Sequence, residues 1–178
     1  METWEWIVLG VTIAAALLLF VALARIRTRR SHLRNQFGSE YTRAVSDSGV
    51  AAAERRLADV EREHEGIELR PLPAAARDRY LEEWRHAEAR FVSDPRDAAR
   101  AAERLVVRVF EERGYPRDDD DGEHLAALVS VDHPDVADRY RHGRAMLEND
   151  ESTENLRKAM LDFRAVLEDV VQGSRTAA

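Results

Sequence analysis

Four consecutive aspartates next to a histidine form the stretch of the sequence that most invites a metal-ion interpretation. The segment RGYPRDDDDGEH runs from Arg113 to His124, and its DDDDG can be aligned with a calcium-binding EF-hand loop whose sixth position is glycine. With Gly122 at that position, Arg117 falls at the first position and Leu128 at the twelfth, where the loop requires acidic ligands. The acidic run therefore predicts a solvated loop or a first helical turn rather than a calcium site.

Two Glu-x-x-His pairs suggest another kind of metal centre, the di-iron site of four-helix carboxylate proteins. The pairs are Glu61 with His64 and Glu83 with His86. At about 100° per residue, the second pair falls on the flank of its helix, whereas His64 falls on an apolar face. HEGIE, at 64–68, resembles a zinc-protease motif except that glutamate replaces the second histidine. We expect no metal or other cofactor; a metal-binding alternative would draw on His64, Glu83, His86, Asp121, His124 and His133.

The composition excludes several other kinds of chemistry. The chain has no cysteine, which removes thiolate catalysis, disulfides and cysteine-based metal clusters. Lys158 is the only lysine, and neither a G-x-S-x-G elbow nor a glycine-rich phosphate loop occurs. The net charge of -7 opposes general binding to nucleic acid. We therefore expect no catalytic residue.

The N-terminus has the features of a single transmembrane helix. Residues 7–24 contain no charged side chain, and as a helix they would span roughly 27 Å of a hydrocarbon core of about 30 Å. Aromatic side chains at one end and arginines at the other are typical of membrane interfaces. These interface residues are Trp4 and Trp6 before the span, and Arg25, Arg27, Arg29, Arg30 and Arg34 after it.

The unequal flanks predict an orientation. Because basic residues stay on the cytoplasmic side, we expect an inner-membrane protein with its N-terminus outside and its helical domain in the cytoplasm. The arginine cluster can also contact anionic lipid headgroups. The alternative is export of the domain after cleavage of a signal peptide, since Ala22 to Ala24 reads as a small-residue cleavage site.

The remaining sequence shows helical periodicity and no alternating strand pattern, which predicts an all-α fold with a bundle of four or five amphipathic helices. The expected segments are a short outer N-terminus at 1–6, the transmembrane helix at 7–24, a basic junction at 25–48, the bundle at 49–172 and a flexible tail at 173–178.

Individual helix boundaries and faces can also be predicted. Asp94 before Pro95 favours a capped helix start, and Gly114 favours a left-handed helix end. Pro134 is expected to open another helix, and 153–171 to form the last one. An aromatic stripe on the helix that starts near Pro73 is expected in the core, and it consists of Tyr80, Trp84, Ala87 and Phe91.

Several blocks of the sequence together resemble a family of proteins. The blocks are HLRNQFGSEYTRAV, LRPLPAAARDRYLEEW, FVSDP, RGYP, LVSVDHPDVADRYRHG and STENLRKAMLDFR, between His32 and Arg164. The family consists of short bacterial proteins with one N-terminal transmembrane helix and a soluble helical domain, usually labelled hypothetical or secreted. The resemblance implies this architecture and no reaction, ligand or partner. The acidic run after RGYP departs from the family pattern.

These features favour a membrane-anchored, non-enzymatic helical module that binds another protein or self-associates. The docking surface is expected where a loop meets two helix ends, at Tyr115, Asp132, His133, Tyr140 and Arg141. One alternative is a metal-binding protein or metal-dependent enzyme, and a second is an envelope or stress-related structural protein.

Overall fold

The computed structural model describes residues 37–117, 122–149 and 152–176, together with Trp4, Leu17 and Phe20. Within these residues the chain forms seven helices and no strand. The predicted all-α class is therefore confirmed. The chain divides into two compact units, Met1–Leu57 and Ala58–Ala178.

The predicted membrane segment falls almost entirely outside the described residues. Only Leu17 and Phe20 of the expected span at 7–24 are described, and Trp6 and the five arginines of the basic cluster are not. Within the described part of the chain, no helix has both the length and the apolar character needed to cross a bilayer.

The first unit contains α2 (Ser39–Ser48) and the first half of α3 (Val50–Glu65). Gly38 and Gly49 flank α2 with φ angles of 50° and 77°, a region that glycine enters without steric cost. The junction expected at 25–48 thus contains a short helix that ends at a glycine. On α3, Ala53 and Leu57 are buried, whereas Val50, the first residue of the helix, is exposed.

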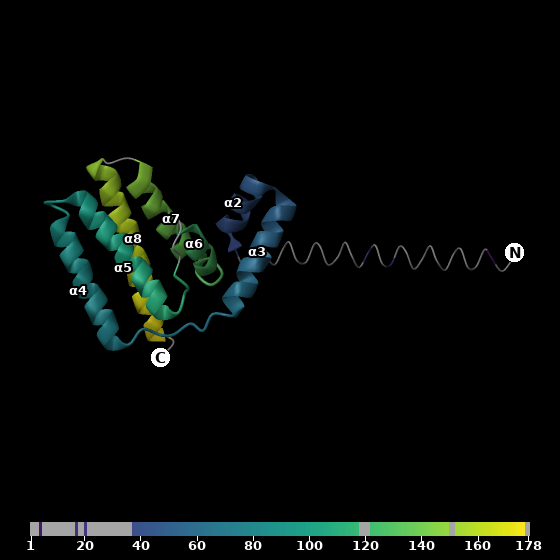
Figure 1. The fold of residues 1–178 in the computed structure, drawn as a ribbon, viewed down its shortest axis with the longest axis horizontal. Helices are drawn as coiled ribbons and strands as arrows, with labels where there is room; N and C mark the ends of the chain where they lie inside the picture. The colour runs from purple at the N-terminus through teal and green to yellow at the C-terminus, as the bar shows by residue number, and fades with distance from the viewer. Residues whose placement is uncertain are drawn as a thin grey trace. The chain divides into compact units, whose positions relative to one another are not determined.

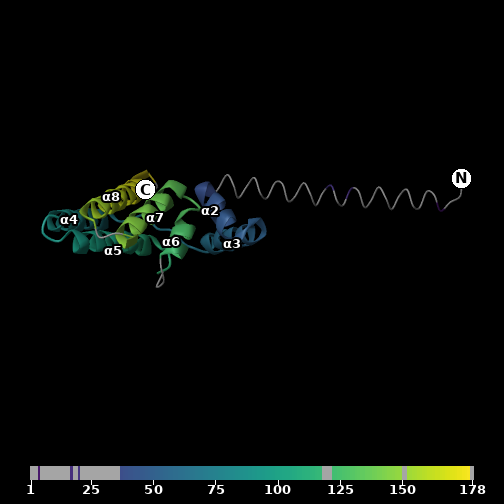
Figure 2. The same ribbon diagram turned by 90° about the horizontal axis from the view of Figure 1, so that it is seen from above.

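The second unit is a bundle of five helices joined to the end of α3. These are α4 (Ala74–Arg90), α5 (Pro95–Arg113), α6 (Glu123–Val129), α7 (Pro134–Asn149) and α8 (Thr153–Thr176). Helix α5 packs against both α4 and α8, and α7 packs against α6 and α8 (Figure 1). Seen from above, α8 and α5 lie in neighbouring layers (Figure 2).

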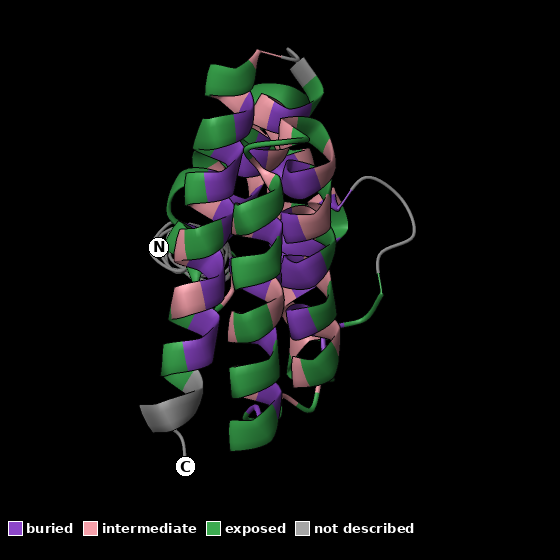
Figure 3. Ribbon diagram, turned by 90° about the vertical axis from the view of Figure 1, so that its left-hand side faces the viewer, coloured by how far each residue is buried: buried purple, intermediate pink, exposed green. Residues whose placement is uncertain are grey.

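The predicted stripe of α4 contributes to the core of this bundle. Tyr80, Trp84 and Ala87 of α4 are buried, as are Phe110 of α5 and Phe163 of α8. The long helices in the view of Figure 3 turn buried residues toward their neighbours and exposed residues outward. Phe91, the last residue of the predicted stripe, is only half-buried.

The ends of α5 follow the local sequence. The carboxylate of Asp94 accepts a hydrogen bond from the backbone N–H of Asp97 at 3.0 Å, and Pro95 is the first helical residue. Gly114 ends the helix in the left-handed conformation, where a Cβ would lie 2.5 Å from the carbonyl oxygen of Glu68. Both helix ends were predicted, and both are confirmed.

Candidate functional site

Two histidines of the metal-binding alternative, His64 and His124, each pair with a carboxylate. His64 Nε2 lies 3.1 Å from Oδ2 of Asp132, an ion-pair distance, although the geometry is not that of a hydrogen bond. His124 Nε2 lies 3.0 Å from Oε1 of Glu63. Among the described residues, each of these two histidines therefore pairs with one carboxylate, which suits a local ion pair better than a metal centre.

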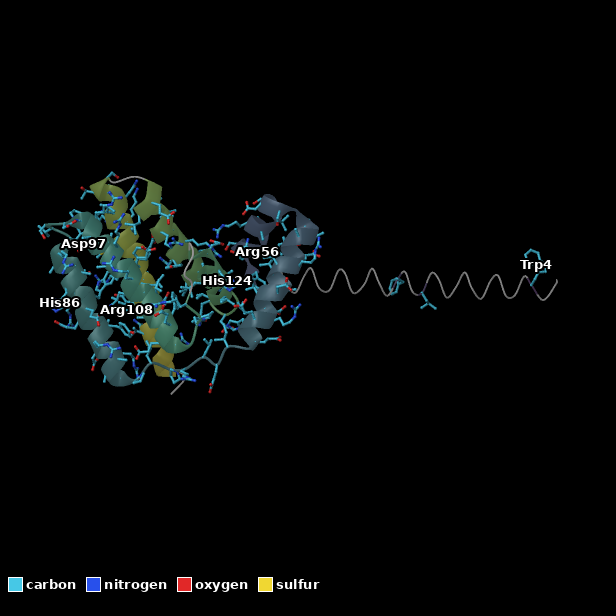
Figure 4. The ribbon with its side chains drawn as sticks, in the orientation of Figure 1. Trp4, Arg56, His86, Asp97, Arg108 and His124 are labelled. Carbon is cyan, nitrogen blue, oxygen red and sulfur yellow. The ribbon has the colours of Figure 1, made fainter. Side chains whose placement is uncertain are left out.

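The other metal candidates are also separate. Glu83 pairs with Arg108, and His86 is exposed on α4, apart from His124 near α6 (Figure 4). Asp121 lies outside the described residues. Within the described ranges, no three His, Cys, Asp or Glu side chains gather closely enough to hold one ion. The Glu-x-x-His spacing thus reflects neighbouring surface residues here.

Three of the five residues of the expected docking surface lie largely inside the unit, and two are exposed. Tyr115 and Tyr140 are buried, with 3% and 2% of their surface exposed. The side chain of Arg141 is 10% exposed, and its Nε lies 2.9 Å from Glu123 Oε2. Only Asp132 and His133 are exposed. The two tyrosines therefore pack inside the unit, because their rings meet Phe110 edge-on.

A more apolar surface lies between α4 and α8. The groove has a volume of about 250 Å³, and four of its seven lining side chains are apolar: Trp84, Phe91, Met160 and Leu161. Trp84 and Met160 form the floor and are nearly buried, whereas the side of the groove is open at Leu161, which is 52% exposed. Such a groove is a surface on which an apolar side chain of another molecule can be buried.

Helical spacing brings the lining residues together. On α4, Trp84, Glu88 and Phe91 follow at intervals of four and three residues, so they share one face. On α8, Arg157, Leu161 and Arg164 follow the same rule. The groove is therefore formed by one face of each helix, the arrangement into which the apolar stripe of a third helix packs.

Arginines and a glutamate form the polar border of the groove. Arg164 Nη1 lies 3.0 Å from Glu88 Oε1, and Arg157 Nη2 lies 2.8 Å from Glu154 Oε1. These side chains are between 41% and 56% exposed. The pKa of Arg164 is raised by its hydrogen bond to Glu168 and by the charge of Glu88, so both border arginines are cationic.

The sequence contained a signal for this groove that the prediction did not use. Leu161 lies roughly 140° around α8 from Leu156, the first residue of the inward stripe, at about 100° per residue. An apolar side chain outside the inward stripe of an amphipathic helix, with arginines three and four residues away, marks a second, more polar contact face. The matching face of α4 becomes visible only once the two helices are packed.

The chain matches no protein-family model, and neither a curated protein nor a solved structure is similar to it.

Proposed function

We propose that this protein is a membrane-anchored, non-enzymatic module whose α4–α8 groove binds an amphipathic helix of another protein. The observation that carries the proposal is the pairing of two helix faces around one apolar groove with Leu161 half-exposed at its side. Binding by a helix is favoured over binding by an extended segment because the described residues form no strand whose edge a peptide could extend.

Burial of the exposed apolar side chains of the groove favours binding of a partner helix. Complete burial of a leucine side chain is worth about 1.5–3 kcal/mol, so covering the exposed half of Leu161 contributes on the order of 1 kcal/mol. Phe91 adds the exposed part of its ring. A partner helix that inserts two or three apolar side chains would add about 1.5–3 kcal/mol for each one that is fully buried. Confinement of both proteins to one membrane would lower the entropic cost of association, which favours a transient complex.

The border charges select the partner. Arg157 and Arg164 project beside the apolar floor, and their present carboxylate partners are held in exposed ion pairs, which contribute only about 0–1 kcal/mol. An acidic side chain of a docked helix can therefore replace these partners at little cost. The expected ligand is a helix with apolar residues at i, i+3 or i+4 and i+7, flanked by aspartate or glutamate.

The membrane anchor is the second part of the proposal. It rests on the uncharged stretch at 7–24, the tryptophans before it and the arginines after it. The two described residues within the span, Leu17 and Phe20, are 58% and 71% exposed. The resemblance to short single-span bacterial proteins points to the same architecture. We place the module at the cytoplasmic face of the inner membrane, with the arginine cluster beside anionic headgroups.

The orientation can be tested with a single cysteine, since the chain has none. Val92 is the best position, because it is 91% exposed. Gly122 is unsuitable, because a Cβ there would lie 2.5 Å from the Arg144 guanidinium. A membrane-impermeant thiol reagent should label Val92→Cys only after lysis. Labelling in intact cells would contradict the orientation and favour the exported alternative.

The groove itself can be tested with two matched substitutions. Leu161→Asp places a charge at the side of the groove, whereas Val92→Asp places one on an exposed residue that does not line it. We expect proteins that co-purify with the full chain from native membranes to be lost from Leu161→Asp and retained by Val92→Asp. Equal losses or no loss would contradict docking at the groove, provided that circular dichroism shows both variants folded.

A further inference from the structure

A second, more polar cavity lies where the ends of three helices meet, away from the α4–α8 groove. It has a volume of about 220 Å³ and is formed by the last residue of α5, the start of α7 and the last turns of α8. Its lining consists of Arg113, His133, Val136, Asp169, Val170 and Gly173. None of these residues borders the α4–α8 groove.

The charged groups around this cavity are not neutralised by one another. The Nε of Arg113 is buried and has no hydrogen-bond acceptor among the described residues. Within the described residues, Arg113, His133 and Asp169 form no ion pair, whereas most arginines of α4, α7 and α8 do. Asp132 directly precedes His133 in the sequence, but its Oδ2 lies 3.1 Å from His64 Nε2 and so pairs with that histidine. A buried guanidinium nitrogen without an acceptor is costly unless a ligand supplies one.

The cavity lining contains groups of opposite charge that are not paired with each other. Arg113 is the last residue of α5, and His133 directly precedes α7, whose N-terminus carries partial positive charge. Asp169, on α8, supplies the carboxylate of the lining. Val136 and Val170 are its apolar residues. A ligand with an anionic and a cationic end can engage both kinds of group at once.

We propose that this cavity binds a small zwitterion of the α-amino-acid class. The carboxylate of the ligand receives hydrogen bonds from the guanidinium of Arg113 and the imidazole of His133, and planar carboxylates suit the guanidinium fork. The ammonium group pairs with Asp169, and a short apolar side chain packs against the two valines. The volume of the cavity is below the roughly 300–1,000 Å³ of pockets for drug-sized ligands, which excludes nucleotides and other large molecules.

Three probes of the same size separate the possible ligand chemistries. L-valine has both charges, 3-methylbutanoate lacks the ammonium group, and 2-methylpropylamine lacks the carboxylate. Calorimetric titration of the full chain in detergent should show saturable binding of L-valine and at least about tenfold weaker binding of the other two, the usual effect of losing one charge-assisted contact. Equal binding of 3-methylbutanoate and L-valine would show that the cavity binds anions and does not require the ammonium group. Absence of L-valine binding would show that the cavity is not an amino-acid site. Either result overturns the proposal.

Variants locate the binding site. Arg113→Gln and Asp169→Asn should each weaken L-valine binding roughly ten- to hundredfold, and Arg100→Gln, an exposed arginine on α5, should leave it unchanged. Gly173→Leu keeps every charge and adds bulk where a Cβ meets no atom within 4 Å, so this variant should fold and still lose binding. Binding of L-valine to Gly173→Leu at parental affinity would overturn the proposal, whether or not the charge variants fold.

Discussion

The guanidinium of Arg164 on α8 lies 3.0 Å from the carboxylate of Glu88 on α4, and both side chains line the α4–α8 groove. Arg164 also donates through Nε to Glu168 at 2.8 Å. The pair thus connects two helices that have few other direct contacts, since α4 packs mainly against α5. Because both side chains are between 41% and 50% exposed, the pair is available to a docked partner.

Replacement of Arg164 by glutamine should therefore separate binding from stability. The free energy of unfolding, measured in urea, should change by no more than about 1 kcal/mol, the upper range for exposed ion pairs. Binding of the partner helix should weaken about tenfold, because a desolvated acidic residue loses its cation. Glu168→Gln is the control, since it removes the other carboxylate of Arg164 outside the groove lining. A large loss of stability in Arg164→Gln would show that the ion pair is structural.

Tyr115 is buried, and its hydroxyl has no hydrogen-bond partner among the described residues. Burial, together with the carboxylate of Asp132, raises the pKa of Tyr115 to about 12, against an opposing effect of Arg113. Because the pKa of Tyr115 in the folded protein lies above the ordinary value of about 10, the folded state binds the phenolic proton more tightly than the unfolded state does. The resulting stability is fully present below pH 10 and is lost as pH rises from 10 to 12.

Tyr115→Phe should remove that alkaline loss. Between pH 10 and 12 the unfolding free energy of the parent should fall by about 2–3 kcal/mol more than that of the variant, at about 1.4 kcal/mol per pKa unit. At pH 7 the variant should be as stable as the parent or more stable by roughly 1 kcal/mol, because it lacks a buried, unpaired hydroxyl. Chemical unfolding at several pH values checks both expectations, and a less stable variant at pH 7 would point to a bound acceptor.

Tyr80 provides the opposite case. Its hydroxyl donates to Glu112 Oε2 at 2.5 Å, and the pKa of Tyr80 is raised by burial and by this hydrogen bond. Tyr80→Phe should therefore destabilise the fold by about 1–2 kcal/mol, the usual cost of losing a hydrogen bond to a charged group. Urea unfolding of Tyr80→Phe and Tyr115→Phe in parallel is the measurement. Equal effects of the two substitutions would contradict the different environments of the hydroxyls.

Gly143 permits the close packing of α7 against α8. A Cβ at this position would lie 2.8 Å from Cε1 of Phe163, a ring that is fully buried and has no room to move. Gly143→Ala should cost about 1–3 kcal/mol through overpacking, although alanine favours helix. Gly173→Ala is the control, since a Cβ there meets nothing within 4 Å. It should be neutral or stabilising by up to about 1 kcal/mol, and thermal unfolding of both variants checks the difference.

Local features of the sequence predicted most of the helix boundaries. Asp94 and Pro95 start α5, and Gly114 ends it, because caps and left-handed glycines act over a few residues. Helix α6 was not predicted, since seven residues are too few to establish a helical period. The apolar face of α4 was predicted, because periodicity alone reveals it.

The placement of functional groups depends on tertiary packing and was predicted less well. Tyr115 and Tyr140 were expected on a docking surface where a loop meets two helix ends, but both rings meet Phe110 in the core. The groove requires both α4 and α8 to pack against α5, a relation between distant segments. Arg113 was interpreted only as a helix-end residue, because its cavity is completed by residues of α7 and α8.

The most direct test of the docking groove is site-specific photocrosslinking in native membranes. A photoreactive amino acid replaces Leu161 in the full chain, and Arg139, exposed on α7 and outside the groove lining, carries it in the control. Peptide mapping should identify a crosslinked segment of another protein from position 161 and not from position 139. This segment should carry apolar residues at i, i+3 or i+4 and i+7, with aspartate or glutamate beside them. Products that are shared by both positions, or that contain only lipid or this same chain, would contradict the proposed partner helix.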